Sequence, residues 1–271
     1  MKEPMEPIVV GVDGSPESMS ALDLAAEEAM SRVVPLTIVH VCDPAADARR
    51  LLATAASRAL AEHPALSVTA ELLSGEPAQA LTERARQAGL LVVGHSPRCG
   101  ARTAGARSVA HQVVSRAGTP VIVDRPLHPS TDAQQPRPVL VGVACTPDDD
   151  AVVQFAFEEA AARGAPLWAA HIWPGSADAV SQQAWRGFAD ERDEADKALV
   201  DTLRAWSEKY PSVALHRIVR HGLDAPVSLT AASRSAQLVV IGSRSPDEQL
   251  HSGAQILAHR GGCSVAVVPL G

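Results

Sequence analysis

An internal repeat constrains this chain more than any other feature of its sequence. Residues 11–16 (Gly-Val-Asp-Gly-Ser-Pro) align with residues 142–147 (Gly-Val-Ala-Cys-Thr-Pro) at an offset of 131. Further along the chain, Gly94 aligns with Gly242 at an offset of 148. A repeat of this length indicates a tandem duplication of whole domains, because each copy is long enough to bury its own core.

The two copies are separated by a linker and differ in length at one place. Residues 124–138 contain four prolines together with Ser, Thr, Gln and Asp, a composition typical of a linker. We therefore expect one domain at 1–125, a linker at 126–137 and a second domain at 138–271. The offset grows by about 16 residues after the second strand of the second copy, where 177–210 predicts one long charged helix.

Short apolar runs alternate with amphipathic segments in each copy. In the first copy we expect strands at 8–12, 35–41, 66–73, 90–93 and 121–123, and helices at 16–31, 45–63, 77–88 and from Arg107. Strands that alternate with helices at short spacing predict βαβ units around a parallel sheet. The wholly apolar strands suit a sheet that helices cover on both faces. The predicted fold class is therefore α/β.

Charge and composition exclude several classes of partner. The net charge of −7 and the isoelectric point near 5.8 argue against a protein that coats nucleic acid, because such binding needs Lys and Arg at the phosphates. Aromatic residues make up only 3% of the chain, so stacking platforms are scarce. We find no signal-peptide pattern and no apolar run of membrane-spanning length, and we expect a cytoplasmic protein.

The four cysteines are widely spaced and form no metal-binding or C-x-x-C pattern. We expect reduced thiols and no structural metal. Cys42, Cys145 and Cys263 lie at expected strand ends, where packing roles are predicted. Cys99 lies between Arg98 and Arg102, whose positive charge favours the thiolate, and a redox role there is the alternative to a passive thiol.

The segment 90–123 has the layout of an anion-binding turn. An apolar strand leads into a loop rich in Gly, Ser and Arg, and then into a helix and a closing strand. The helix presents unpaired N–H groups and its positive dipole end to the carboxyl edge of the sheet, where a phosphate fits. Gly94 leaves room for close approach, and Ser108 can cap the helix or bind a phosphate oxygen. The alternative is that Gly94 only turns the chain and Ser108 only caps.

These residues resemble the universal stress protein family over both copies. The resemblance is carried by residues 10–18 (Val-Gly-Val-Asp-Gly-Ser-Pro-Glu-Ser), by the strand end Val39-His40-Val41, and by the Gly94 loop that leads into Ser108. It implies two tandem Rossmann-like domains of the adenine nucleotide alpha hydrolase-like type, each with a five-stranded parallel sheet flanked by helices. It also implies a stress-response regulatory or protective protein.

Family members that bind ATP carry a G-x-x-G loop followed by nine residues and G-[ST]. The resemblance assigns Asp13 to the acidic position near adenosine, Val41 to the base contact, Gly94 to the first glycine and Ser108 to the final hydroxyl. ATP, accompanied by Mg²⁺, is the implied ligand of the first copy. The nucleotide-binding candidates are Val12, Asp13, Gly14, Ser15, Val41, Gly94, His95, Arg98, Arg107, Ser108 and Val109.

The loop departs from the family pattern at two positions of the first copy. Pro97 stands at the second glycine, which removes an N–H that could face a phosphate. Arg107 stands at the third glycine, where it adds bulk but brings a guanidinium able to bind a phosphate through two hydrogen bonds.

The second copy departs further from the family pattern. Ala144 replaces the acid, and its loop has Ser245, Gln255 and Ile256 where Gly and Gly-Ser are expected. An apolar Ile at the hydroxyl position leaves little to hold an anion, so we expect no nucleotide in the second copy.

The remaining motifs favour a binding protein over an enzyme. His40 with His171, and His111 with His259, occupy equivalent repeat positions, which predicts packed histidines and not metal ligands. No nucleophile elbow, Walker lysine motif or H-E-x-x-H occurs, so we expect no enzymatic activity.

Two alternatives to a nucleotide-binding protein stay open. One is a family member that binds no nucleotide and acts through protein interaction. The other is a slow ATP hydrolase in which Asp13 holds Mg²⁺ or water.

The last strands of the two copies, 121–123 and 265–268, offer open edges for pairing. The family resemblance implies that they form an intramolecular pseudo-dimer of the two copies or a homodimer.

Overall fold

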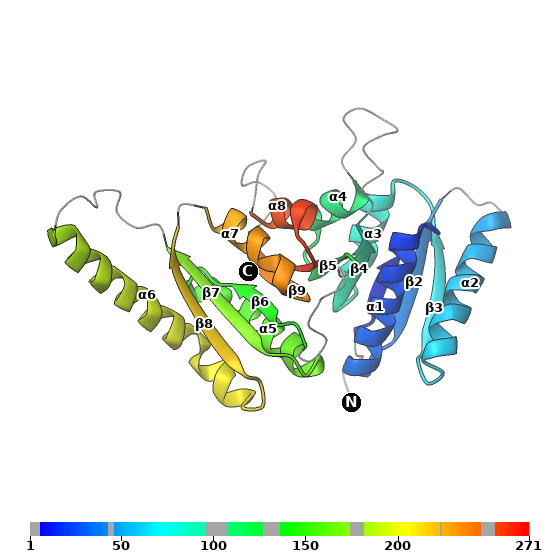
Figure 1. Ribbon diagram of the computed structural model, residues 1–271. Helices are drawn as coiled ribbons and strands as arrows, with labels where there is room; N and C mark the ends of the chain where they lie inside the picture. The colour runs from blue at the N-terminus through cyan, green and yellow to red at the C-terminus, as the bar shows by residue number, and fades with distance from the viewer. Residues whose placement is uncertain are drawn as a thin grey trace. The chain divides into compact units, whose positions relative to one another are not determined.

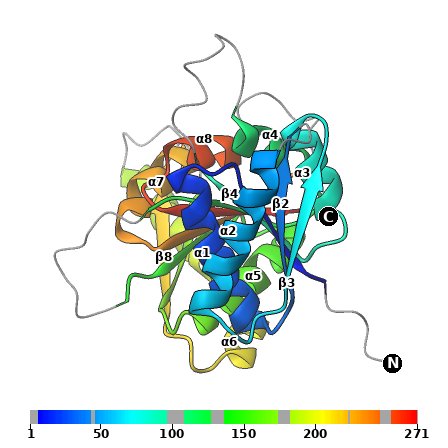
Figure 2. The same cartoon turned by 90° about the vertical axis from the view of Figure 1, so that its right-hand side faces the viewer.

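The computed structural model describes residues 6–42, 46–95, 108–126, 136–173, 182–222, 224–244 and 253–270, with backbone only for 46 and 182–188. The described chain divides into two compact units, shown in Figure 1 and turned by 90° in Figure 2. The first unit holds the described residues up to Pro126 together with Ser264–Pro269. The second unit holds the other described residues from 136 onward.

The first unit is a parallel sheet with one added antiparallel strand. Its elements are β1 (Ile8–Gly11), α1 (Pro16–Arg32), β2 (Leu36–Val41), α2 (Ala46–Glu62), β3 (Val68–Leu73), α3 (Pro77–Ala85), β4 (Leu90–Gly94), α4 (Val109–Arg116), β5 (Val121–Asp124) and β10 (Ser264–Pro269). The strand order is β3-β2-β1-β4-β5, all parallel, and β10 pairs antiparallel with β5. The strands that follow β1 in the chain, β2 and β3, lie on one side of it, and β4 and β5 lie on the other. The strand order therefore reverses between β1 and β4.

Helices cover both faces of this sheet. Helices α1 and α2 contact each other on one face, and α3 and α4 contact each other on the other (Figures 1 and 2). The central strands β1, β4 and β5 are almost wholly buried, with Val9, Val10 and Leu90 0% exposed, whereas β3 is partly exposed. Continuous apolar strands are what a sheet covered on both faces requires, and this explains the apolar runs of the sequence.

Local signals set the ends of helix α1. Ser15 is its N-cap and accepts a hydrogen bond from the Ser18 N–H, and Pro16 occupies the first turn, where a missing N–H costs nothing. The helix ends at Val33, which adopts a left-handed conformation with φ of 57°. Between these ends Leu22 and Ala25 are fully buried, and the small alanine lets the helix approach the sheet closely.

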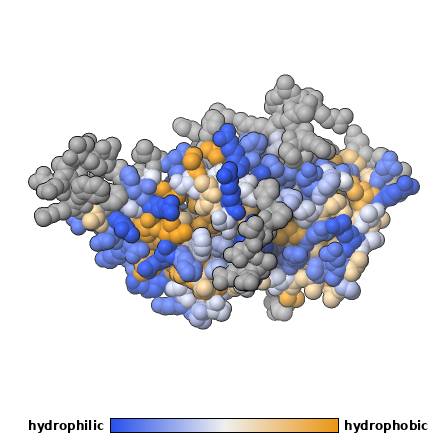
Figure 3. Space-filling view, viewed as in Figure 1, coloured by the Kyte–Doolittle hydropathy of each residue, from blue (hydrophilic) through white to orange (hydrophobic). Residues whose placement is uncertain are grey.

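The second unit repeats the same plan with four parallel strands. Its elements are β6 (Val139–Gly142), η2 (Pro147–Asp149), α5 (Asp150–Ala162), β7 (Leu167–Trp173), α6 (Gln182–Lys209), β8 (Leu215–His221), α7 (Ala225–Ala232), η3 (Ser233–Ser235), β9 (Leu238–Ser243) and α8 (Gly253–Arg260). The strand order is β9-β6-β7-β8. Hydrophobic residues reach the surface of this view at several places (Figure 3). In β7 and β8, Trp168, Ile172 and Ile218 are partly exposed.

Most expected elements are present with shifted ends. The long helix expected at 177–210 is α6, which is described from Gln182 to Lys209, and residues 177–181 lie outside the described ranges. The helix expected from Arg107 begins at Val109, because Ser108 serves as its N-cap. The helix expected at 77–88 ends at Ala85.

Three of the four cysteines lie among the described residues. Among the described residues, Cys42, Cys145 and Cys263 form no disulfide with one another, and Cys263 is buried. Cys99, with its neighbours Arg98 and Arg102, lies outside the described residues. Among the helices that the structure describes, none has the length and apolar character needed to cross a membrane.

Candidate ligand site at the carboxyl ends of β1, β2 and β4

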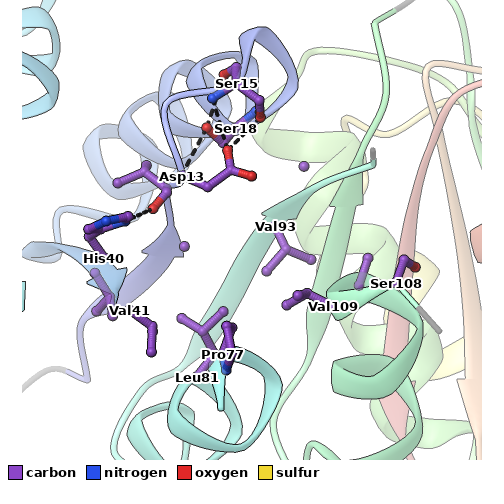
Figure 4. A pocket seen from close by; sticks show the side chains of 15 residues that line it. Asp13, Ser15, Ser18, His40, Val41, Pro77, Leu81, Val93, Ser108 and Val109 are labelled. Carbon is purple, nitrogen blue, oxygen red and sulfur yellow. Dashed lines mark hydrogen bonds between the residues drawn. The ribbon is translucent and has the colours of Figure 1, made fainter. Parts of the chain in front are cut away.

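A pocket of about 180 Å³ opens in the first unit where the strand order reverses, between the ends of β1 and β4. Parallel α/β sheets bind ligands in the crevice at such a reversal, because the two neighbouring connections leave in opposite directions there. The apolar lining comes from Val12, Val39, Val41, Pro77, Leu81, Val93, Val109 and Ala110. The other lining residues are Gly11, Asp13, Ser15, Ser18, His40, Gly94 and Ser108 (Figure 4).

Asp13 lies at the mouth of the pocket and is fixed by the turn that opens α1. Its Oδ1 accepts hydrogen bonds from the Ser15 N–H at 2.9 Å and from the Ser15 hydroxyl at 2.5 Å. Its own N–H donates to the Ser18 hydroxyl oxygen at 3.2 Å. Figure 4 shows the other carboxylate oxygen of Asp13 directed away from Ser15. The turn therefore holds the carboxylate in one orientation before any ligand arrives.

The charge of Asp13 is stabilised by the same contacts. Partial burial acts to raise the pKa of this carboxyl group, but the hydrogen bonds from Ser15 and Ser18 outweigh it and leave the pKa below its ordinary value of 3.8. The carboxylate is therefore ionised at neutral pH. It can accept hydrogen bonds from hydroxyl or amino groups of a ligand, and it repels a phosphate placed next to it.

His40 fastens the end of β1 to the end of β2. Its Nδ1 lies 2.7 Å from the Val12 carbonyl oxygen, and because a carbonyl only accepts, Nδ1 carries the proton and donates. The second unit has the same contact, with His171 Nδ1 at 2.9 Å from the Val143 carbonyl oxygen. This confirms that the two histidines occupy one shared structural position, although His40 also lines the pocket.

Gly94 is required by packing inside the first unit. A Cβ on this residue would lie 2.5 Å from the Glu17 carbonyl oxygen and 2.9 Å from the Ser18 nitrogen, both backbone atoms of α1. The absent side chain thus lets the end of β4 approach the first turn of α1. This close approach accounts for the glycine without a ligand.

Ser108 both caps a helix and lines the pocket. Its hydroxyl oxygen accepts a hydrogen bond from the His111 N–H at 3.2 Å, so it is the N-cap of α4. It also lines the pocket, on the side away from Asp13 (Figure 4). The two readings of Ser108 are therefore compatible: it caps the helix at the place where the helix faces the pocket.

The structure brings most of the described candidates together. Val12, Asp13, Ser15, Val41, Gly94, Ser108 and Val109 all line the pocket. Gly14 is not among the lining residues; its φ of +85° turns the chain between Asp13 and α1. His95 is also outside the lining, and its N–H donates to the Asp124 carbonyl at 3.0 Å. Pro97, Arg98 and Arg107 lie outside the described residues.

Several lining residues were missed from the sequence. Leu81 and Pro77 belong to α3, which follows β3 and also begins at the carboxyl edge of the sheet. The sequence does carry a signal for Pro77 and Leu81, because every helix that follows a parallel strand starts at the carboxyl edge of the sheet. Ser18 was missed because its hydroxyl reaches Asp13 only through the geometry of the helix turn.

Two polar positions of the pocket are apolar in the second unit. Ala144 replaces Asp13, and Ile172 and Ile256 replace Val41 and Ser108. Ile256 belongs to α8 and is partly exposed. Within the described part of the chain, no cluster of three or more His, Cys, Asp or Glu residues could hold a metal ion.

Comparisons with known proteins identify the family. The model of the Universal stress protein family matches residues 5–125 and 136–269. Universal stress protein Rv2005c of Mycobacterium tuberculosis H37Rv is 36% identical over 262 residues, which cover 87% of this chain and 86% of the relative. Universal stress protein MT2052 of Mycobacterium tuberculosis CDC 1551 is 31% identical over 302 residues, covering 96% of this chain and 94% of the relative.

A solved structure shows the same fold over nearly the whole chain. The crystal structure of a universal stress protein from Archaeoglobus fulgidus DSM 4304 has a TM-score of 0.69 and covers 98% of this chain and 97% of that chain, at 16% identity. The repeat, the two α/β units and the two family matches agree with one another. The chain belongs to the universal stress protein family, as a member with two tandem domains.

Proposed function

We propose that the first unit binds an adenine nucleotide, ATP with Mg²⁺, and that the protein is a regulatory or protective binding protein of the stress response. The observation that carries this proposal is the placement of an ionised Asp13 and of Ser108 on different sides of an apolar pocket at the strand-order reversal. The pocket has the mixed character of many nucleotide sites, with apolar walls and a few fixed polar groups.

Each part of the pocket suits a different part of a nucleotide. The side chains of Val41, Leu81 and Val93 offer apolar contact to a flat ring. Asp13 accepts hydrogen bonds from sugar hydroxyl or amino groups. Because its charge repels phosphate, the phosphates belong on the side of α4, where Ser108 caps a helix N-terminus.

The second unit is proposed to bind no nucleotide. Its equivalent positions offer the methyl group of Ala144 and the apolar side chains of Ile172 and Ile256. None of these can accept or donate a hydrogen bond through its side chain. A crystal soaked in ATP that shows density at Ile256 would contradict this part of the proposal.

Titration calorimetry of the full chain with ATP and Mg²⁺ tests the binding proposal. We expect binding that Asp13→Ala weakens, and an absence of heat at millimolar ligand would remove the proposal. Mass spectrometry of small molecules released from the protein as purified is the complementary test. A bound adenine nucleotide in that fraction supports the proposal directly.

A family member that acts through protein interaction alone is the second candidate. It is favoured by Pro97 and Arg107, which occupy glycine positions of the loop pattern, and by the degenerate second copy. Gel filtration distinguishes it from the first candidate, since a protein that carries ATP through the column binds nucleotide.

A slow ATP hydrolase is the third candidate, in which the carboxylate of Asp13 would hold Mg²⁺ or water. We propose that the protein is not an enzyme. Turnover that persists unchanged in an Asp13→Ala variant would indicate a contaminating activity.

Assembly and location complete the proposal. The antiparallel pairing of β10 with β5 supports a pseudo-dimer of the two copies, and a homodimer is proposed as a further assembly that light scattering can test. We propose a cytoplasmic location, which is consistent with the absence of a disulfide among Cys42, Cys145 and Cys263.

A further inference from the structure

The edge strand of the second unit borders an apolar surface that carries basic side chains. β8 ends the strand order β9-β6-β7-β8, and among the strands that the structure describes it pairs with β7 alone. Trp168, Ile172 and Ile218 are partly exposed there, and His216 and Arg220 are exposed. These five residues are called the β8 face below.

The register of β7 and β8 places these side chains on one side of the sheet. Trp168 pairs with His216, and their rings lie 6.3 Å apart in an edge-to-face contact. The next residue of β8, Arg217, lies 3.7 Å from the carboxylate of Asp196 on α6. Because successive side chains of a strand point to opposite faces, α6 covers one face of β8, and the β8 face is the other (Figure 1).

The backbone of β8 has an edge that faces away from β7. The Leu167 N–H donates to the Ala214 carbonyl at 2.9 Å, and the Gly222 N–H donates to the carbonyl of the last residue of β7 at 3.1 Å. Even-numbered residues of this stretch therefore direct their N–H and C=O groups to β7, because the groups alternate along a strand in a parallel pair. The odd-numbered residues from 215 to 219 direct theirs to the outer edge, which is a template for one more strand.

The first unit closes the equivalent surface with its own side chains. At the position of Ile218 it has Glu71, at an offset of 147, and the guanidinium of Arg84 on α3 donates to that carboxylate at 2.8 Å and 3.1 Å. At the position of Arg84 the second unit has Ala232, at an offset of 148. An ion pair between helix and strand in one unit is therefore a partly exposed isoleucine beside an alanine in the other.

The exchange of polar for apolar residues extends to the neighbouring strand. Trp168 occupies the position of Thr37, which is only 4% exposed, at an offset of 131. At the amino end of β8, His216 lines a hollow of about 380 Å³ whose other walls include Pro166 and Val213. A large aromatic side chain and a hollow at the same strand end suit an anchoring side chain of a partner.

Charge decides which occupant fits. β8 carries His216, Arg217 and Arg220, and neither β7 nor β8 contains Asp or Glu. Pairing with β8 of a second copy would bring these basic side chains together, and like charges on paired strands are destabilising. A strand with acidic side chains is complementary instead.

We propose that the β8 face is a docking site for another protein, which adds an extended segment to the outer edge of β8. The segment is apolar at its centre, where it packs on Ile218 and Trp168, and acidic on either side, where it meets His216 and Arg220. Its backbone pairs with residues 215–219. This interaction goes beyond the proposed nucleotide function and does not depend on it.

Fluorescence anisotropy with labelled peptides tests the proposal on the full chain. The probe is the peptide Thr-Glu-Thr-Ile-Thr-Glu-Thr, which places two acids around an apolar residue on one face of a strand. A second peptide has Lys in place of both Glu residues, and a third is the acidic peptide N-methylated along its backbone. We expect the acidic peptide to bind at least about ten-fold more tightly than either of the others.

Variants of the protein locate the site. Ile218→Glu introduces the residue of the first unit without its arginine partner, and should weaken the acidic peptide by about ten-fold. Arg220→Gln should weaken it by about three-fold.

Two variants of the first unit are matched controls. Leu60→Glu adds the same acid at a leucine of α2 that is 41% exposed, and Arg86→Gln removes the same charge from an exposed side chain. Both should leave the affinity unchanged. Circular dichroism shows whether each variant is folded, and if Ile218→Glu is not, the affinity of Arg220→Gln decides.

Several results would overturn the proposal. An absence of binding at millimolar acidic peptide, equal binding of the lysine or N-methylated peptide, or an affinity unchanged in both site variants would each do so. A dimer in light scattering that Ile218→Glu dissociates would show that a second copy covers the β8 face, and would also contradict the proposed partner. Each of these results leaves the proposed nucleotide site of the first unit standing.

Discussion

The two units place a carboxylate differently in the turn that follows their first strand. In the first unit Asp13 lies exposed at the pocket, and the neutral Ser18 occupies the helix turn. In the second unit Ala144 stands at the mouth, and the turn holds Asp149, which is 3% exposed and accepts from the Thr146 N–H at 2.7 Å. One unit therefore has a carboxylate at the proposed ligand pocket, and the other uses a carboxylate to cap its own helix.

Contacts that serve the fold are retained in both units. The histidine that donates to the carbonyl 28 residues before it occurs twice, as His40 with Val12 and as His171 with Val143. Asp13 and Ser108, which we propose to face a ligand, are replaced by Ala144 and Ile256 in the second unit. The comparison thus separates a contact that serves the fold in both units from residues proposed to bind a ligand in one.

The largest expected effect concerns the glycine at the end of β4. Gly94→Ala should destabilise the first unit by about 3 kcal/mol, because its Cβ would lie 2.5 Å from backbone of α1, which cannot move aside cheaply. Gly242→Ala is the matched variant in the second unit. Its Cβ would meet the flexible tip of Leu270 at 2.8 Å, so we expect a cost of about 1 kcal/mol. Denaturant unfolding measures the free energy of unfolding of both variants. Equal losses in the two variants would contradict the difference expected between the two units.

The buried cap of the second unit gives the next effect. Asp149→Ala should destabilise the protein by about 2 kcal/mol, because it removes the acceptor of the Thr146 N–H at the start of a helix. Ser18→Ala, at the equivalent position of the first unit, should cost about 1 kcal/mol. Thermal unfolding of the two variants compares them, and a larger cost at Ser18 would contradict a capping role specific to Asp149.

The pH dependence of binding sharpens the role of Asp13. Because its pKa is held below 3.8, the carboxylate is already ionised at pH 5, and its contribution to binding should be constant between pH 5 and 8. The contribution should be lost only as the pH falls through the lowered pKa. Asp13→Asn should weaken adenosine binding by about ten-fold at pH 7. Calorimetry across this range checks both statements, and an affinity that rises between pH 5 and 7 only when Asp13 is present would contradict them.

The smallest expected effect is a lack of reactivity at Cys145, which stands at the position of Gly14. Both residues have positive φ, of 61° and 85°. Burial raises the pKa of the Cys145 thiol to about 11, against the lowering effect of a hydrogen bond with Thr202. At pH 8 only about one thiol in a thousand is then ionised. Iodoacetamide followed by peptide mass spectrometry should find Cys145 unmodified in the native protein and modified in the unfolded one.

The fold could be predicted from the sequence because its signals are local and repeated. Apolar runs such as 8–12 and 90–93 mark buried parallel strands, and the offsets of 131 and 148 show that the pattern occurs twice. Ser108 could be found because it stands where a strand meets the next helix at the carboxyl edge, and Asp13 could be found through the family resemblance.

The remaining features depend on register and side-chain geometry. Arg125 lies after the last strand of the first copy, and only the pairing of Gly94 with Asp124 shows that it reaches His95. The alignment already places Asp149 opposite Ser18, but the capping hydrogen bond requires the coordinates of the turn. The antiparallel pairing of β10 with β5 joins the two strands that the family resemblance singled out, but its register comes only from the coordinates.

The central claim is that two copies of one fold share a single ligand site, in the first unit. Titration of the full chain with ATP and Mg²⁺ tests it most directly when the unaltered protein is compared with Asp13→Ala. We expect one site per chain and a clear loss of affinity in the variant. Two sites per chain, or binding that Asp13→Ala leaves unchanged, would contradict the claim.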